Sequence, residues 1–327
     1  MRSHPSRWRT APGSAALALS ALASAAGCGT GFAAEAGRAA PRGATAPLAA
    51  PATPAPAPAA SQGTVGRRLR ALEKARGTRI GAYAIDTGTG RFLGYRADER
   101  FAFLSTFKAM ASAAVLRKAR RTDPGLMDRV VHYTEADLVE HSPVTKEHVA
   151  TGMTVAELCD AAITVSDNTA GNLVLRQIGG PAGHTAFLRS LGDRISRADR
   201  WETDLNIWAP GERRDTTAPR VWARDLRDLA VGPALDPADR ARLTGWLKDS
   251  ETGAARIRAG LPKDWTVGDK TGTNDSAGLA NDVAVAWPPS GAPLVFVVLT
   301  NRRSGGGADD GAVARTATIL SEGLGRS

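Results

Sequence analysis

The chain has 327 residues, of which 43% are hydrophobic and 5% aromatic, and its formal net charge is +9. Residues 1–60 hold five arginines against a single acidic residue, whereas the charges of the remainder are mixed in sign and form no long basic block. This pattern argues against nucleic-acid binding, and the length suits one large globular unit or two modest ones.

The N-terminus predicts an export signal. Arginines within residues 1–9 precede a short, weakly apolar stretch over 11–27, which is typical of a signal peptide rather than a membrane-spanning helix. Residues 23–25 fit a small-x-small cleavage site, while the residues around Cys28 also resemble a lipoprotein signal in which Cys28 is lipidated. Both routes stay open. We expect a signal peptide over 1–28 and a product that is secreted or anchored to the outer face of the cell membrane.

An Ala- and Pro-rich segment follows the leader. Residues 29–62 have too little apolar surface to pack, so we expect a disordered tether there and a catalytic domain over 63–327. Within that domain, residues 63–104 and 251–327 predict an α/β lobe, and residues 105–250 predict a helical lobe.

The predicted elements of this domain follow the order helix, strands, helices, strands, helix. Residues 65–75 have helical spacing, and residues 80–86 and 91–95 predict two strands around a Gly-rich turn. The middle of the chain is mainly helical. Strand patterns return at 265–271, 279–287 and 294–300, before a closing helix at 312–324. The fold class is therefore α+β: one antiparallel sheet of about five strands, flanked by the N- and C-terminal helices, with an inserted all-helical domain and a cleft between the two.

Three short motifs occur in order along this chain: Ser105-Thr106-Phe107-Lys108, Ser166-Asp167-Asn168 and Lys270-Thr271-Gly272. Each one alone is commonly a helix start, a turn or a strand end. Together they form a known signature of class A β-lactamases and penicillin-binding proteins.

Each motif has a chemical reason. Ser105 and Lys108 stand one helical turn apart on one face, and an amine held among other cations can take the proton of a serine nucleophile. The Ser105 backbone N–H, near a helix start, is free to donate to an oxyanion. Ser166 can pass a proton to a leaving nitrogen, and Lys270 supplies positive charge from a facing strand.

Further segments extend the resemblance over residues 65–325, and they resemble the class A serine β-lactamases, in a branch like that of actinobacteria. These segments are Arg100–Lys108, His141–Thr145, Ser166–Asn172, Asp199–Asn206, Arg214–Thr217, Ala254–Pro262, Trp265–Thr273 and Asn281–Trp287. The resemblance implies hydrolysis of the β-lactam ring of penicillins and cephalosporins through an acyl-enzyme on Ser105.

Glu202 is the most discriminating residue of this resemblance. In the family, a glutamate on an Ω loop, here Arg200 to Asp215, activates the water that hydrolyses the acyl-enzyme. The resemblance implies that Asn206 helps to hold this water and that Arg200 and Asp215 pair across the mouth of the loop. The acylation base, either Lys108 directly or Glu202 through a water, stays open.

The resemblance also implies a set of binding residues. The backbone N–H groups of Ser105 and Thr273 form the oxyanion hole, Asn168 binds the substrate's side-chain amide, and His141 stands where an aromatic residue lines the cleft. The substrate carboxylate is expected to lie among Lys270, Thr271, Gly272, Thr273 and Arg256, whose fork-shaped guanidinium suits a carboxylate.

We expect no cofactor and no metal, because the histidines show no ligand spacing. The expected partners are small β-lactam substrates, with no nucleic acid and no obligate protein partner, so a monomer is expected, with membrane attachment depending on Cys28. Two alternatives remain: a penicillin-binding D,D-peptidase or esterase on the same fold, and a non-catalytic protein that binds cell-wall fragments. Glu202 and Asn206 argue against the first, and the pairing of Lys108 with Glu202 argues against the second.

Overall fold

The structure is a computed structural model that describes residues 60–302 and 306–326. The predicted signal peptide, Cys28 and the tether up to residue 59 lie outside the described residues, so their assignments stay predictions. None of the helices in the described part is long and apolar enough to cross a membrane.

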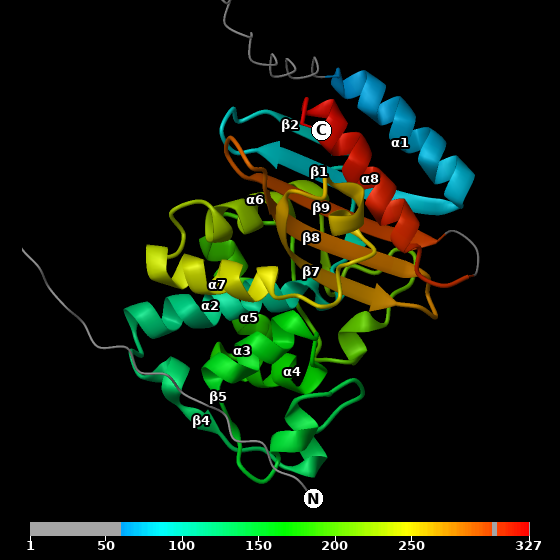
Figure 1. Ribbon diagram of the computed structural model, residues 1–327. Helices are drawn as coiled ribbons and strands as arrows, with labels where there is room; N and C mark the ends of the chain where they lie inside the picture. Colours follow the sequence, from blue (N-terminus) through cyan, green and yellow to red (C-terminus); the bar gives the residue numbers. More distant parts are fainter. Residues whose placement is uncertain (1–59, 303–305, 327) are drawn as a thin grey trace, which may run out of the picture. The chain divides into compact units, whose positions relative to one another are not determined.

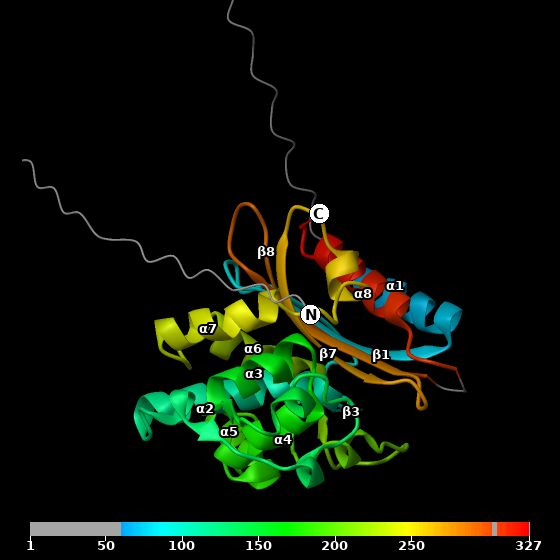
Figure 2. The ribbon, with the colours of Figure 1, turned by 60° about the horizontal axis from the view of Figure 1, so that its bottom comes forward.

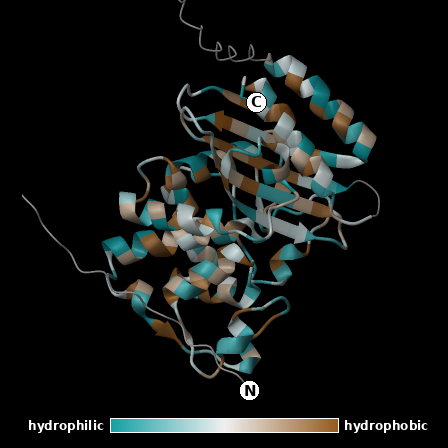
Figure 3. Cartoon of the chain, viewed as in Figure 1, coloured by the Kyte–Doolittle hydropathy of each residue, from teal (hydrophilic) through white to brown (hydrophobic). Residues whose placement is uncertain are grey.

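A five-stranded antiparallel sheet forms the centre of the α/β part, as predicted (Figure 1). Its order is β2-β1-β9-β8-β7, so strands from the two ends of the chain pair directly: Tyr83 of β1 lies opposite Val297 of β9. Figure 3 shows hydrophobic stretches along the central strands. The strands are β1 (Thr78–Asp86), β2 (Phe92–Tyr95), β7 (Thr266–Asn274), β8 (Leu279–Trp287) and β9 (Leu294–Arg302).

The N- and C-terminal helices cover one face of this sheet (Figure 1). They are α1 (Gln62–Arg76) and α8 (Asp310–Gly323), and their buried side chains, such as Leu69 and Leu320, form one core with Phe296 of the sheet. The Ser61 hydroxyl accepts the Thr64 N–H at 3.2 Å and caps α1. The helix therefore starts at the last residue assigned to the tether, because a serine cap satisfies an otherwise free N–H.

The opposite face of the sheet meets the helical part (Figure 2). Its central helix α2 is almost entirely buried. Helices α6 and α7 belong to the segment predicted as the helical lobe, yet both pack directly against the sheet as well as against other helices. The helices are α2 (Phe107–Arg121), α3 (Val155–Thr164), α4 (Asn168–Gln177), α5 (Gly180–Ser190), α6 (Pro219–Ala230) and α7 (Pro237–Lys248).

Short elements complete the described chain. Two small antiparallel pairs join β3 (Phe101–Ala102) to β6 (Thr216–Thr217) and β4 (Val130–Val131) to β5 (Met153–Thr154). The first of these pairs ties the segment before Ser105 to the end of the Ω loop, so two parts of the predicted site are joined by backbone hydrogen bonds. The 3-10 turns are η1 (Leu104–Thr106), η2 (Leu126–Asp128), η3 (Glu135–Asp137), η4 (Thr145–His148), η5 (Asp204–Asn206) and η6 (Ile257–Gly260).

Candidate active site

Ser105 lies in the 3-10 turn η1, directly before α2. Contacts of the residues on both sides of Ser105, Leu104 and Thr106, fix the path of the backbone there. Leu104 adopts a left-handed φ of 50° with its side chain fully buried. The Thr106 hydroxyl donates to the Phe103 carbonyl at 2.6 Å and accepts from the Trp222 indole at 3.1 Å. Because its neighbours are anchored in the core, Ser105 is held in a fixed position, and it is 9% exposed.

Lys108, one turn along α2, is fully buried among oxygen atoms. Its Nζ donates to Ser105 Oγ at 3.1 Å, to the Ser166 carbonyl at 2.7 Å and to Asn168 Oδ1 at 2.6 Å. It also forms an ion pair with Glu202 Oε1 at 3.2 Å. Loss of solvation lowers the pKa of Lys108, and the Glu202 charge opposes this effect.

Ser166 lies at the turn between α3 and α4, with a left-handed φ of 62°. The next residue, Asp167, caps α4 by accepting the Ala170 N–H at 2.8 Å and also binds the Thr145 hydroxyl at 2.9 Å. This buried carboxylate fixes the turn, and the Ser166 hydroxyl consequently lies between two lysines: 3.0 Å from Lys270 Nζ and 3.4 Å from Lys108 Nζ.

Lys270 extends from the edge strand β7 and is also fully buried. Its Nζ donates to the Thr271 carbonyl at 2.9 Å in addition to Ser166. Burial lowers the pKa of Lys270 well below its usual value, and the nearby Lys108 charge lowers it further. The two lysines and Ser166 thus form a chain along which a proton can move.

Gly272 brings strand β7 against the nucleophile. A Cβ atom at this position would lie 2.8 Å from Leu104 Cβ and 3.1 Å from the Ser105 backbone nitrogen. Glycine is therefore required by the close approach of the two backbones. Strand β7 therefore passes close to Ser105 at Gly272, and Thr273, the second predicted oxyanion-hole residue, is the next residue of that strand.

Glu202 points toward the nucleophile. Its Oε1 accepts the Ser105 hydroxyl at 3.0 Å, and its Oε2 accepts the Asn206 side-chain amide at 2.7 Å. Asn172 holds the Glu202 backbone from both sides, accepting its N–H at 2.9 Å and donating to its carbonyl at 2.9 Å. The Glu202–Thr203 peptide bond is cis. The carboxylate is buried and fixed at both of its oxygens.

The Arg200–Asp215 pair closes the mouth of the Ω loop, as the resemblance implied. Arg200 Nε donates to Asp215 Oδ2 at 2.6 Å, and the Asp215 side chain is 1% exposed. Asp215 Oδ1 also accepts the backbone N–H groups of Asp199 and Arg200 at 2.8 and 3.1 Å. A buried carboxylate with three donors is a firm anchor for the loop that carries Glu202.

The Arg256 guanidinium is bound to Thr273 and to neighbouring acceptors. Its Nη2 donates to Thr273 Oγ1 at 2.7 Å, its Nη1 to the Gly272 carbonyl at 3.0 Å, and its Nε to Asp310 Oδ1 at 2.7 Å. Because each of its nitrogens already has an acceptor, the guanidinium orients the Thr273 hydroxyl. The Thr271 hydroxyl is held in turn by Thr252 at 2.6 Å.

Asn168 begins α4, and the backbone of His141 contacts it. The Asn168 amide donates to the Glu140 carbonyl at 2.8 Å, so its oxygen is turned toward Lys108. The His141 carbonyl accepts the Asn168 N–H at 2.9 Å, whereas its exposed ring is bonded to the Val165 carbonyl at 3.1 Å. His141 therefore contacts this group through its backbone.

Comparison with known proteins identifies the family. The model of the beta-lactamase enzyme family matches residues 64–324. Beta-lactamase AST-1 of Nocardia asteroides is 56% identical over 251 residues, which cover 77% of this chain and 80% of that protein. The chain belongs to the class A β-lactamases.

Solved structures agree with this class A assignment. The β-lactamase from Streptosporangium roseum has a TM-score of 0.79 and 58% identity, and the match covers 80% of this chain and 99% of that one. A last common ancestor of Gram-negative class A β-lactamases has a TM-score of 0.76 and 50% identity, covering 79% of this chain and 98% of its own. The predicted family and the predicted fold are both confirmed.

Two positioning residues of this class A β-lactamase had no role in the sequence interpretation. Asn172 clamps the Glu202 backbone, and Asn281 of β8 donates to the Ala102 carbonyl at 2.8 Å while accepting the Thr300 N–H at 2.9 Å. For Asn172, a signal existed, since it stands four residues after Asn168 on the same helical face. Asn281 carries no comparable signal, because its partners lie far away in the sequence.

Proposed function

We propose that Ser105 forms the acyl-enzyme and that Glu202 directs the deacylating water in the β-lactam hydrolysis that this chain, as a class A β-lactamase, catalyses. One observation carries the proposal: Ser105 Oγ lies 3.0 Å from Glu202 Oε1 and 3.1 Å from Lys108 Nζ. A nucleophile in contact with a base, which is held by further groups, is the arrangement that acyl transfer to water requires.

Acylation begins when Ser105 loses its proton. Two groups are within reach of this proton, the Lys108 amine and the Glu202 carboxylate. Burial lowers the pKa of Lys108 and thereby favours the neutral amine that can accept a proton. The backbone N–H groups of Ser105 and Thr273 would then donate hydrogen bonds to the negatively charged carbonyl oxygen, and these hydrogen bonds would stabilise the tetrahedral intermediate.

Ring opening needs a proton on the lactam nitrogen. Ser166 is suited to deliver it, because its hydroxyl lies within hydrogen-bond distance of both Lys108 and Lys270. The positive charge of Lys270 and the Thr271 and Thr273 hydroxyls would bind the substrate carboxylate, with Arg256 acting through Thr273. Asn168 would bind the side-chain amide of the substrate.

Deacylation distinguishes this reaction from that of a penicillin-binding peptidase. Glu202 would take a proton from the attacking water, and Asn206, bonded to the other carboxylate oxygen, would keep it oriented. General-base assistance of this kind contributes about 10²- to 10⁴-fold. The opened drug then leaves, and Ser105 recovers its proton.

The nucleophile is tested with Ser105→Ala. This variant should lose hydrolysis of a chromogenic cephalosporin and should form no covalent adduct by mass spectrometry. Ser276→Ala, at an exposed serine in the β7–β8 turn, is the matched control and should keep the parent rate. Full activity of the Ser105 variant would refute the assignment, and slow release of penicillin by the parent protein would favour a peptidase.

We also propose that the chain is exported and acts outside the cytoplasm. The arginines of residues 1–9, the weakly apolar stretch at 11–27 and the cleavage pattern at 23–25 support this. N-terminal sequencing of the processed protein gives the cleavage point. Fatty-acid labelling that disappears in Cys28→Ala would assign the lipoprotein route, whereas an unlabelled, processed protein in the medium would assign secretion.

A further inference from the structure

A cavity of about 440 Å³ lies between the outer turn of the Ω loop and the sheet. Its volume is in the range of small-molecule sites. None of the residues that line it belongs to the group around Ser105. Side chains from β1, β9, the segment before β3 and the Ω loop converge on it, among them Arg79, Arg100, Trp208, Arg213, Asn301 and Arg302.

The charges of this cavity are unbalanced. Arg79 pairs with Glu99 at 2.7 Å and Arg302 with Asp309 at 3.7 Å. In the part of the chain that the structure describes, Arg100 has no carboxylate partner and the Arg213 guanidinium has neither a hydrogen bond nor an ion pair.

The carboxylate that lines the cavity does not neutralise these two guanidinium groups. Glu212 is already bound by Arg214, with Nη2 to Oε2 at 2.5 Å. Its remaining acceptors are taken by the backbone N–H groups of Arg213 and Arg214, at 2.8 and 2.9 Å. Positive charge therefore remains inside the cavity.

The surroundings of Arg100 show the excess of positive charge most clearly. Burial lowers the pKa of Arg100, and the positive charges of Arg213 and Arg197 lower it further, whereas the charge of Asp193 opposes them. Its Nη1 donates to Thr216 Oγ1 at 3.0 Å, a neutral acceptor. A partly desolvated guanidinium beside other cations gains much more from an anion than an exposed one does.

Trp208 supplies an apolar wall. Its half-buried side chain packs against the small cluster of Ala102, Leu104 and Leu279 and also lines the cavity. An indole presents a large face on which a planar ring can stack. Pro210 adds apolar surface beside it.

We propose that this cavity is a second binding site, which takes a small aromatic anion. The oxyanion group of the ligand, a carboxylate or a phosphate, is held by the guanidinium groups of Arg100 and Arg213, whose fork geometry matches such groups. The aromatic ring of the ligand stacks on Trp208.

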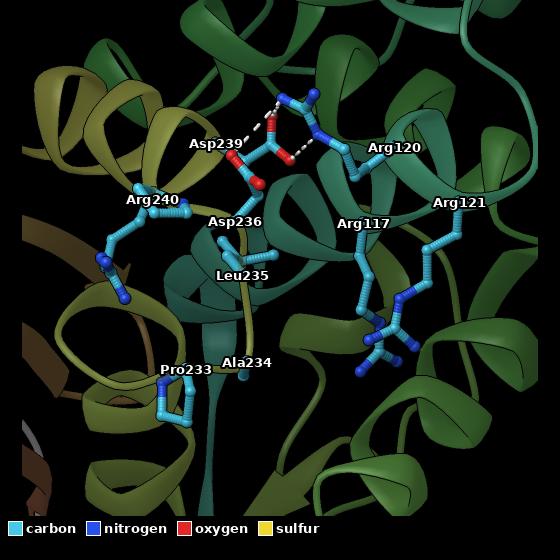
Figure 4. Close-up of a pocket in the computed structure, with 10 residues that line it drawn as sticks. Arg117, Arg120, Arg121, Pro233, Ala234, Leu235, Asp236, Asp239 and Arg240 are labelled. Carbon is cyan, nitrogen blue, oxygen red and sulfur yellow. Dashed lines mark hydrogen bonds and ion pairs between the residues drawn. The ribbon is translucent and has the colours of Figure 1, made fainter.

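A second basic cavity, of about 420 Å³, does not meet these conditions (Figure 4). Arg117 and Arg121 line it from the last turns of α2, where cations complement the helix dipole. Arg120 is paired with Asp239 at 2.9 Å and Asp236 at 3.7 Å. The helix end and these carboxylates account for the charges, so no ligand is needed to explain them.

Calorimetric titration of the full chain with phenyl phosphate tests the proposal. Inorganic phosphate and phenol serve as the anion-only and ring-only probes, and both should bind at least about 10-fold more weakly, since each makes half of the contacts. Arg213→Ala, at an exposed and unpaired side chain, should weaken phenyl phosphate binding by about 10-fold or more. Trp208→Leu should weaken phenyl phosphate but not inorganic phosphate.

Arg91→Ala is the matched control, because it removes the same charge from an exposed turn that does not line the cavity. It should bind phenyl phosphate as the parent does. Two results would overturn the proposal. The first is an equal loss of phenyl phosphate affinity in Arg91→Ala and Arg213→Ala. The second is phenyl phosphate binding that is unchanged in Arg213→Ala and is displaced by a penicillin. The second result would locate the anion at the group around Ser105. Thermal unfolding of each variant checks that it is folded.

Discussion

At the scale of single residues, Ser105, Lys108 and Glu202 form a buried triangle with all three sides near 3 Å: 3.1, 3.2 and 3.0 Å. The Lys108 and Glu202 side chains are both fully buried. Removing one partner of such a pair leaves an uncompensated charge, which is strongly destabilising. A test of the chemistry therefore needs a variant that keeps the shape of the side chain.

Glu202→Gln meets this need. The amide keeps the size of the carboxylate and can still bond to Ser105, but it cannot accept a proton from water. We expect deacylation to slow by about 10²-fold or more, so that a penicilloyl adduct on Ser105 accumulates and is visible by mass spectrometry.

Asp204→Asn is the control for this prediction, since it makes the same chemical change at an exposed position of the same loop. It should turn over substrate as the parent does. A Glu202→Gln variant that shows parental steady-state rates and no adduct would contradict the role of Glu202.

At the scale of elements, the site depends on how closely strand β7 approaches the start of α2. Residues 266–274 of β7 pair in register with β8, so Thr273 lies opposite Ala280 and its position is fixed by the sheet. Gly272 permits the contact with Ser105. The proposed oxyanion hole would therefore be formed by two elements, β7 and η1, and a single added Cβ atom at Gly272 would change their separation.

Gly272→Ala should consequently separate β7 from η1. Because a displacement of about 1 Å at a catalytic site can cost on the order of 10²-fold, we expect kcat/KM for a penicillin to fall by roughly that factor. Gly245→Ala is the control, because a Cβ there, in the middle of α7, meets nothing within 4 Å. It should keep its activity and gain about 0.5–1 kcal/mol in free energy of unfolding. Equal activity of the two variants would exclude this role for Gly272.

At the scale of the whole molecule, polar groups that the catalytic site does not use are buried between α5 and α6. His184, Asp193 and Asp225 are all almost completely buried, and both His184 nitrogens and one oxygen of each carboxylate have no donor or acceptor partner in the described residues. Burial, and after it the charge of Asp193 and a hydrogen bond with Asp193, raises the pKa of Asp225 to about 9, so the Asp225 carboxyl keeps its proton at neutral pH. Asp228 and Arg189 also act on Asp225.

The raised pKa of Asp225 makes the stability of the fold depend on pH. The folded state holds the Asp225 proton up to about pH 9, whereas the unfolded chain releases it near pH 4. The stabilising contribution is complete below pH 4 and is lost as pH rises toward 9, by up to about 1.4 kcal/mol per pH unit.

Asp225→Asn should remove this dependence, since the amide keeps a donor toward Asp193 and cannot ionise. In urea unfolding, we expect the stability of the variant relative to the parent to rise steadily from pH 5 to pH 9. Asp264→Asn, which makes the same change at an exposed carboxylate in the turn before β7, is the control and should follow the parent curve. Parallel curves for Asp225→Asn and the parent would disprove the raised pKa of Asp225.

The sequence by itself determined much of this protein. Short apolar runs located the strands of the sheet, because such runs are a local property, and the structure buries most of their side chains on both faces. The spacing of Ser105 and Lys108 placed them on one helical face. The three motifs and Glu202 identified the family.

The tertiary structure alone decided the rest. Asn172 and Asn281 work through backbone atoms that are distant in sequence, Arg256 turns out to hold Thr273, and α6 and α7 pack against the sheet. The cavity beside Trp208 likewise draws its arginines from four separate segments. Hydrogen bonds and charges of this kind depend on distances in space, which no local pattern of residues encodes.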